Sequence, residues 1–143
     1  MVDFIIYVDG KQMGAQSADG VVCSTATGSP VYALAAGGPI LHPSMDAVVL
    51  VPVAPHTLSN RPIVLPSSKR IEIELVNSRD ATAYFDMQEF CDCEPGDMLR
   101  IQRSERVMEL LHPLSYDYYD LLRRKLKWNY SPTSEKHHEQ ISG

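Results

Sequence analysis

The sequence AVVLVPV, residues 47–53, is an unbroken run of aliphatic side chains, most of them β-branched. A run of this length and composition is typical of a β-strand whose two faces are both buried, because neither face carries a polar side chain for solvent. Pro52 cannot donate a backbone hydrogen bond to a neighbouring strand, so it favours a bulge or a strand end at that position. The stretch therefore predicts a strand that is covered from both sides.

A second stretch, RIEIELV at residues 70–76, shows the strict alternation of a half-buried strand. Ile71, Ile73 and Leu75 point one way, and Glu72, Glu74 and Val76 point the other. Asp9-Gly10 predicts a tight turn between two further strands, because both residues tolerate positive φ. The remaining segments with strand character are FIIYV (4–8), KQMGAQ (11–16), VVCST (21–25, after a second Asp-Gly turn at Asp19-Gly20), TAYFDMQEF (82–90), MLRIQR (98–103) and RVMELLH (106–112).

The long helical signal comes late, in YDYYDLLRRKLKW at residues 116–128. Ser115 is placed to cap this helix, and acidic residues precede basic ones along it, as the helix dipole favours. Tyr119, Leu122 and Leu126 form its apolar stripe. Residues 129–143 lose periodicity and predict a disordered tail after a folded domain of residues 1–128. The predicted fold class is mainly β, with two packed sheets forming a sandwich, a short helix after residue 29 and one C-terminal helix.

Composition limits the classes of function. The chain has 143 residues, which is one domain, and its net charge of −5 argues against a phosphate-binding nucleic-acid surface. No apolar run is long enough to span a bilayer, and the charged start lacks a signal-peptide pattern, so no membrane partner is expected. The three cysteines do not form a disulfide framework, which favours a reducing cytoplasm.

The segment from Asp19 to Pro43 is rich in glycine and hydroxyl groups and almost free of charge. Within it, Ser29 is a good N-cap, Pro30 suits a first helical position, and Gly37 suits the residue that ends a helix. Thr25, Thr27, Gly28 and Ser29 then form a small corner at a helix start, where backbone N–H groups face a ligand. A tight packing corner without any ligand explains the same residues.

The same segment resembles the C-terminal domain of NAD kinases. STATGSPVYALAAGGPILHP (24–43), followed by PHTLSNRP (55–62), is close to the family pattern S-T-P-T-G-S-T-A-Y-S-x-S-A-G-G-P, H-P and P-H-T-L-S-x-R-P. Asp19-Gly20, Asp86 to Gln88, the Glu-Pro-Gly-Asp turn and His112-Pro113 follow in family order. The resemblance implies a β-sandwich that binds NAD and forms homo-oligomers. It also implies transfer of the ATP γ-phosphate to the 2′-hydroxyl of the NAD adenosine ribose, which gives NADP.

Carried over residue by residue, the resemblance implies an NAD site with Tyr32 stacking on the dinucleotide or hydrogen-bonding to it. The implied site residues are Asp19, Thr25, Thr27, Gly28, Ser29, Pro30, Val31, Tyr32, Ala33, Leu34, Ala35 and Gln88. Three departures from the family pattern affect them. Ala26 replaces a proline, Ser29-Pro30-Val31-Tyr32 replaces Ser-Thr-Ala-Tyr and so removes a hydroxyl and a backbone donor, and Met87 replaces a glycine.

The catalytic motif of the family, Gly-Gly-Asp-Gly, does not occur in the sequence. No catalytic residue is therefore assigned, and Mg²⁺ or another divalent cation is implied only together with ATP. The chain is expected to be the C-terminal half of a kinase: a fragment, a truncated product, or a subunit completed by another chain. The alternative is a non-catalytic module that binds a dinucleotide or oligomerises.

Two further residue groups have weaker claims to function. Cys91 and Cys93 with His137 and His138 suggest a metal, but ordinary surface thiols explain them better, so no metal ligand is assigned. His56 suits contact with a substrate phosphate or hydroxyl, although a turn-stabilising role is the more common one.

Overall fold

The computed structural model describes residues 1–27 and 30–126 and divides the chain into two compact units. The first unit, Met1–Glu105, contains the described strands and a short helix. The second begins at Arg106 and contains a second helix. In chain order the elements are β1 (Val2–Val8), β2 (Lys11–Ala18), β3 (Gly20–Thr25), α1 (Pro30–Ala35), β4 (Ala47–Val53), β5 (Ile63–Pro66), β6 (Ile71–Asn77), β7 (Ala81–Phe85), β8 (Glu89–Cys93), β9 (Met98–Ile101) and α2 (Tyr118–Leu126).

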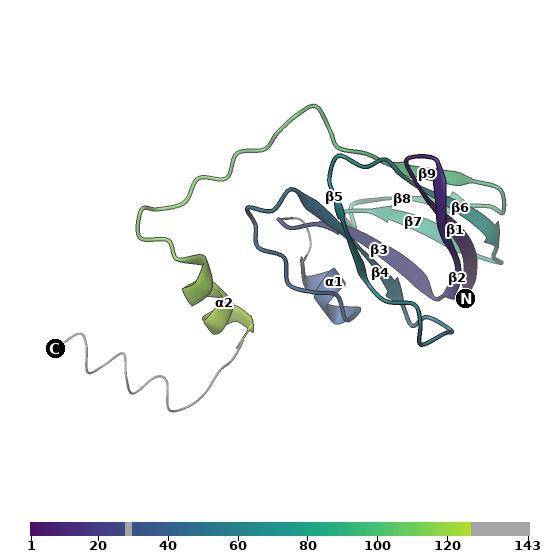
Figure 1. The fold of residues 1–143 in the computed structure, drawn as a ribbon, viewed down its shortest axis with the longest axis horizontal. Coiled ribbons are helices and arrows are strands. Elements are labelled where there is room, and N and C mark those ends of the chain that lie inside the picture. The colour runs from purple at the N-terminus through teal and green to yellow at the C-terminus, as the bar shows by residue number, and fades with distance from the viewer. Residues whose placement is uncertain (28–29, 127–143) are drawn as a thin grey trace. The chain divides into compact units, whose positions relative to one another are not determined.

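The strands form three antiparallel sheets (Figure 1). One has four strands in the order β2-β1-β6-β9, the second has three in the order β3-β4-β5, and β7 and β8 form a hairpin of their own. The main core joins the first two sheets. Phe4, Ile6, Ala18, Ile71 and Ile73 come from the four-stranded sheet, and Val48 and Leu50 come from β4. The predicted β-sandwich is confirmed.

Strand β4 is buried on both faces, as its sequence predicts. Val48 and Leu50 point into the sandwich core, whereas Val49 and Val51 pack against Ala33 of α1 in a second apolar cluster. In Figure 1, α1 lies beside β3 and β4. Pro52 is tolerated because it lies beyond Leu50, the last residue of β4 that pairs with β5.

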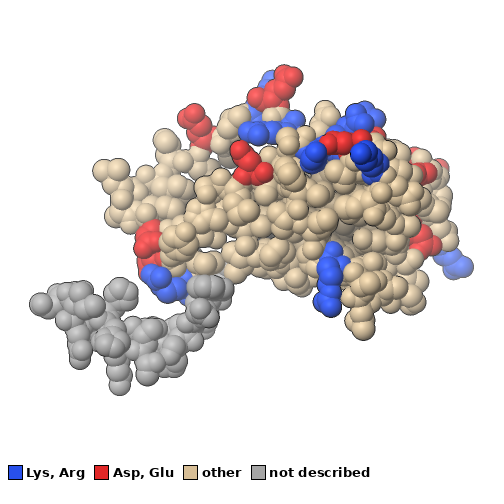
Figure 2. Space-filling model, viewed as in Figure 1, with Lys and Arg blue, Asp and Glu red and all other residues tan. Residues whose placement is uncertain are grey.

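The alternation predicted for β6 is also present. Ile71, Ile73 and Leu75 are buried, and Glu72 and Glu74 lie on the outer face. Arg70 and Arg100 both form ion pairs with Glu72, at N–O distances of 3.4 and 3.1 Å. The Tyr7 hydroxyl donates a hydrogen bond to Glu74 Oε2 at 2.8 Å. Figure 2 shows acidic and basic side chains interspersed rather than separated on the visible face.

The two Asp-Gly pairs behave differently. Asp9 and Gly10 have φ values of 49° and 79°, so the predicted tight turn between β1 and β2 is confirmed. The Asp9 carboxylate accepts a hydrogen bond from Arg70 N at 2.9 Å, and this bond together with Lys69 lowers the pKa of Asp9. Asp19 instead is a single bend between β2 and β3, which belong to different sheets, and its N–H donates to Val53 O at 2.9 Å.

Two predictions about the C-terminal unit are wrong. Residues 106–112 are not a strand, because alternation alone supplies no partner ladder, and Leu111 is 93% exposed. Helix α2 begins at Tyr118, and its N-cap is Asp117 rather than Ser115. Asp117 Oδ1 accepts hydrogen bonds from the N–H groups of Tyr119 and Asp120, at 2.9 and 3.4 Å, which satisfies two donors of the first turn. The predicted helix end at Trp128 and the tail 129–143 lie outside the described residues.

Helix α1 ends in two glycines that have different roles. Gly37 has a φ of 83° and donates to Leu34 O at 2.9 Å, while Gly38 donates to Ala33 O at 2.7 Å. This pair of bonds is the Schellman arrangement, with Gly37 as the left-handed residue that the sequence predicted. Gly38 is required by space: a Cβ atom there would lie 2.7 Å from both Ala33 O and Val51 Cγ2.

Gly38→Ala is therefore expected to destabilise the fold by about 1–3 kcal/mol, because the added methyl group overpacks the contact between α1 and β4. Urea unfolding followed by circular dichroism measures the change. Gly14→Ala is the matched control, since a Cβ at Gly14 meets nothing within 4 Å. It is expected to raise stability by about 0.5–1 kcal/mol, because glycine inside a strand is less stable than alanine. Equal stabilities for the two variants would contradict the close packing at Gly38.

Candidate functional site

The predicted ligand corner follows the last residue of β3. Thr25 ends that strand and is exposed, as is Thr27. The buried Ser24 donates its hydroxyl hydrogen bond to Thr25 O at 3.0 Å, which fixes the backbone at the entrance to the corner. Gly28 and Ser29 lie outside the described residues. The predicted N-cap and the close approach of a ligand at Gly28 therefore stay predictions.

Helix α1 starts at Pro30, as predicted, and places Val31 and Tyr32 in its first turn. Its position is set by Ala33, which is 2% exposed and packs against Val49 and Val51. A ligand contact by Ala33 would therefore have to use its backbone. Leu34 is half-buried and Ala35 is exposed. The second apolar cluster thus anchors the helix whose start forms the corner.

Asp19 and Thr25 lie at opposite ends of β3. The strand pairs antiparallel with β4, so that Gly20 faces Val53 and Thr25 faces Val48. Six strand residues span about 17 Å from end to end. Within one chain, one small chemical group of a ligand cannot contact both residues.

Gln88, the last of the predicted site residues, lies at the end of the β7–β8 turn. Its side chain is exposed, and its N–H donates to Phe85 O at 3.1 Å, which closes the turn. The two residues inside the turn, Asp86 and Met87, have φ values of 52° and 57°. This left-handed pair is the hairpin geometry that favours glycine at the second position, where this chain has Met87.

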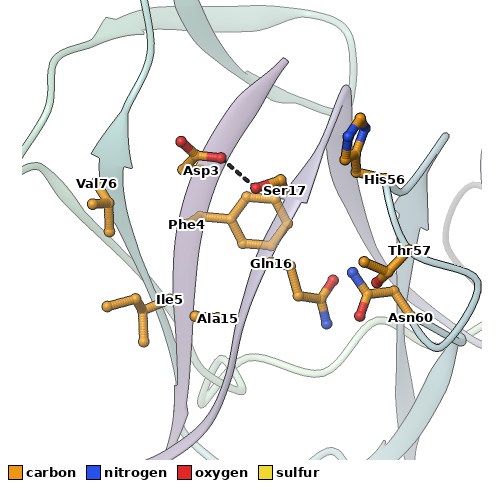
Figure 3. Close-up of a pocket in the computed structure, with 10 residues that line it drawn as sticks. All are labelled: Asp3, Phe4, Ile5, Ala15, Gln16, Ser17, His56, Thr57, Asn60 and Val76. Atoms are coloured by element: carbon orange, nitrogen blue, oxygen red, sulfur yellow. Dashed lines mark hydrogen bonds between the residues drawn. The ribbon is translucent and has the colours of Figure 1, made fainter.

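A pocket of about 320 Å³ lies where the loop after β4 passes β2 (Figure 3). Sequence reasoning singled out only His56 among its lining residues. The His56 N–H donates to Ser17 O at 2.9 Å, and the Ser17 hydroxyl donates to the Asp3 carboxylate. Gln16 Oε1 is buried and has no hydrogen-bond partner among the described residues. The complete lining is Asp3, Phe4, Ile5, Ala15, Gln16, Ser17, His56, Thr57, Asn60 and Val76.

This pocket was missed because a loop and a strand far apart in sequence assemble it. Asp3 and Ser17 are cross-strand partners of β1 and β2, and His56 reaches them only because the loop folds back along β2. The polar groups at residues 3, 16 and 17 carry no recognisable spacing. One signal could have found part of it. Gln16 is the cross-strand partner of the buried Phe4, so the alternation of side chains along β2 places its polar group on the core face.

The described residues contain no preformed metal cluster. In residues 1–27 and 30–126, no three His, Cys, Asp or Glu side chains converge in a way that could hold a metal ion. Any Mg²⁺ that accompanies ATP would therefore be held largely by the phosphates. His137 and His138, which the sequence offered as partners for Cys91 and Cys93, lie outside the described residues. Cys23, Cys91 and Cys93 are free thiols.

Comparison with known proteins shows to which family this chain belongs. The profile of the ATP-NAD kinase C-terminal domain family matches residues 1–112. The chain belongs to this family. It therefore shares the family's fold, and the segment from Thr25 to Tyr32 lies within the matched residues.

Relatives with high identity agree with the family assignment. The NAD kinase of Cupriavidus pinatubonensis is 52% identical over 135 residues, which is 94% of this chain and 44% of the relative. That of Ralstonia nicotianae is 51% identical, over 94% of this chain and 45% of the relative. The chain therefore spans less than half the length of these relatives.

Solved structures give the same result. The yeast NADH kinase complexed with NADH superposes with a TM-score of 0.80 and 26% identity, over 91% of this chain and 41% of the yeast chain. The NAD kinase from Archaeoglobus fulgidus in complex with ATP gives a TM-score of 0.66 and 31% identity, over 73% of this chain and 40% of that chain.

Within the described part of this chain, no helix is both long and apolar enough to cross a membrane.

Met87→Gly is expected to stabilise the fold by about 0.5–1 kcal/mol, because glycine adopts the left-handed conformation without the steric cost that methionine bears. The free energy of unfolding in urea measures the effect. Met98→Gly is the matched control: Met98 is 46% exposed, comparable with 58% for Met87, but lies in β9. Glycine there is expected to destabilise by a similar amount. A loss of stability in both variants would contradict the backbone geometry of the turn.

Proposed function

We propose that this chain is the NAD-binding half of an NAD kinase, which transfers the γ-phosphate of ATP to the 2′-hydroxyl of the adenosine ribose of NAD and gives NADP. The observation that carries the proposal is the family match over residues 1–112, together with relatives named NAD kinase at about half identity. The complex of the related yeast enzyme with NADH supports a dinucleotide as the ligand of this fold.

In this proposal, the corner binds the dinucleotide through backbone and hydroxyl groups and through one aromatic ring. Thr25 and Thr27 offer exposed hydroxyls, Gly28 admits the ligand close to the backbone, and Tyr32 stacks on the dinucleotide or hydrogen-bonds to it. Ser29, Val31, Leu34 and Ala35 complete the contact surface. Pro30 has no N–H group, so at that position the ligand is held by shape rather than by a backbone hydrogen bond.

ATP and the divalent cation belong to the part of the kinase that these 143 residues do not contain. The sequence has no Gly-Gly-Asp-Gly motif, and the described residues have no cluster for a cation. Phosphoryl transfer depends on positioned phosphates and neutralised charge. The chain therefore orients the acceptor hydroxyl, and its activity requires a second polypeptide segment. The free thiols are consistent with the cytoplasm as the place of action.

A homo-oligomer is the second part of the proposal. Asp19 and Thr25 are separated by the length of β3. If both side chains contact the same end of one NAD molecule, they must therefore come from two copies of the chain. An exposed apolar group on the β7–β8 hairpin supplies surface for such contacts: Tyr84, Phe85, Met87 and Phe90 are each more than half exposed.

The kinase proposal is tested by co-expressing this chain with the N-terminal portion of the Cupriavidus pinatubonensis relative. The pair is expected to form NADP from NAD, ATP and Mg²⁺, and the chain alone is not. Loss of stacking in Tyr32→Ala is expected to raise KM for NAD about 10–100-fold while KM for ATP stays constant. Tyr7→Phe, on the outer face of the four-stranded sheet, is the control and should leave both constants unchanged.

Three results would count against this assignment. An unchanged KM for NAD in Tyr32→Ala would show that the tyrosine has no role in binding. NAD binding by a well-folded co-expressed pair without any NADP formation would favour the non-catalytic module. Absence of any NAD-induced stabilisation would exclude the kinase and a dinucleotide-binding module and leave only an oligomerisation module, since a ligand at ~100 times its Kd stabilises a protein by ~2.7 kcal/mol.

The shared-site proposal is tested by mixing two inactive variants. Asp19→Ala and Tyr32→Ala are each expected to bind NAD poorly. In randomly mixed dimers, about a quarter of the sites receive Tyr32 from one variant and Asp19 from the other, so about a quarter of the binding capacity should return. Isothermal titration of co-refolded chains measures the recovered stoichiometry. If mixing restores nothing although heterodimers form, the site lies within one chain.

A further inference from the structure

Two of the free cysteines lie on one face of the β7–β8 hairpin. Cys91 and Cys93 are two residues apart in β8, so their side chains leave the strand on the same side. Their cross-strand partners in β7 are Ala83 and Ala81. The same face also carries Phe85 and Glu89, which pair with each other across the hairpin, whereas the opposite face carries the Tyr84–Phe90 ring pair and the hydrogen bond from Thr82 to Asp92.

The alanines leave space above the two sulfur atoms. Across the ladder, Ala83 and Ala81 present only methyl groups to the two cysteines. Cys91 is exposed and Cys93 is partly buried. Cys23 differs, because it packs against the sandwich core. Cys91 and Cys93 are therefore the thiols in the described chain that a small solute can reach together.

The two thiols share one electrostatic environment. Cys93 Sγ lies 3.7 Å from Cys91 O, so it leans along the strand toward its neighbour. Burial raises the pKa of Cys93, and hydrogen bonding with the Cys91 side chain, the charge of Cys91 and the charge of Asp97 raise it further, whereas a backbone hydrogen bond with Ala83 lowers it. The negative charge of Asp97 opposes the negative charge of a two-thiolate complex, so it is the geometry of the pair that favours an ion here.

The spacing is too long for a disulfide and suits a bridging ion. Two residue steps along a strand separate the Cα atoms, and the parallel Cβ atoms, by about 6.7 Å. A disulfide needs a Cβ separation near 3.8 Å. Two metal–sulfur bonds of about 2.3 Å in line span about 4.6 Å, which the sulfur atoms reach by leaning slightly toward each other.

We propose that Cys91 and Cys93 form a two-thiolate site for a soft monovalent cation of the Cu(I) type. Soft thiolate ligands select such ions. No third His, Cys, Asp or Glu joins the pair among the described residues, which disfavours the closed tetrahedral site that structural zinc requires. Binding balances as Cu⁺ + 2 RSH → [Cu(SR)₂]⁻ + 2 H⁺. This site is independent of the proposed dinucleotide corner.

The proton balance fixes the sign of the pH dependence. Both thiols lose a proton when they bind the ion, as the binding equation requires. Below the thiol pKa values, affinity is therefore expected to increase about 100-fold for each unit of pH, because two protons leave for each ion bound.

The test is an anaerobic titration of the full chain with Cu(I), in competition with a chromogenic Cu(I) chelator such as bicinchoninate. One ion per chain is expected, with release of two protons and the stated slope with pH. Cys91→Ser and Cys93→Ser are each expected to weaken binding at least about 100-fold, because one thiolate cannot chelate. Cys23→Ala should bind like the parent chain.

A variant with unchanged thiol count separates geometry from composition. The double substitution Cys91→Ser with Asp92→Cys keeps three cysteines but places the adjacent pair on opposite faces of β8. It is expected to bind as weakly as Cys91→Ser. Parent-like binding by this variant, a stoichiometry above one, or a pH slope of one proton would overturn the proposal. Circular dichroism of each variant confirms that the hairpin and sandwich are intact.

Discussion

The arrangement of this domain depends on the burial of β4 from both sides. Val48 and Leu50 close the sandwich core, and Val49 and Val51 hold α1 through Ala33. Each such side chain contributes about 1.5–3 kcal/mol when fully buried. The strand therefore does two things at once: it joins the two sheets and fixes the helix at whose start the candidate ligand corner lies. Gly38 allows this contact because no side chain fits between Ala33 and Val51.

Strand β3 links the buried strand β4 to the candidate site. It hydrogen-bonds to β4 along its whole length, so neither of its ends can move without breaking the ladder. One end leads into the corner, and the other continues into Asp19, which is bonded to Val53. Because the strand is rigid and carries proposed ligand groups at both ends, these groups lie at two separate places on the molecular surface. Symmetric association of copies is the simplest way for both groups to meet one dinucleotide.

Local patterns predicted the parts of this structure that local physics determines. AVVLVPV and RIEIELV became the doubly buried and the half-buried strand, and Asp9-Gly10 and Gly37 adopted the positive φ values that their residue types favour. The wrong predictions concern choices among competing local signals: Asp117 rather than Ser115 caps α2, and residues 106–112 alternate without a partner strand. The pocket beside Gln16 was beyond prediction because it needs the loop at His56 to meet β2. The ligand corner stays a prediction: its residue types suit a ligand-facing helix start and a packing corner equally, and the resemblance to the family is what favours the ligand.

The physical character of the domain suits the dinucleotide-binding part of the kinase that we propose. Binding an extended dinucleotide calls for fixed backbone groups, and an antiparallel sandwich provides them because its ladders restrain every strand. Phosphate transfer calls for concentrated positive charge, whereas the charges described here are exposed and mixed in sign, with Glu72 placed between Arg70 and Arg100. The two requirements conflict within one small surface, because a positive field that attracts ATP would also attract the pyrophosphate of NAD away from its productive orientation. In the kinase that we propose, the conflict is removed if this domain supplies the rigid dinucleotide site and another segment supplies the charge, and the reaction then depends on the two parts meeting.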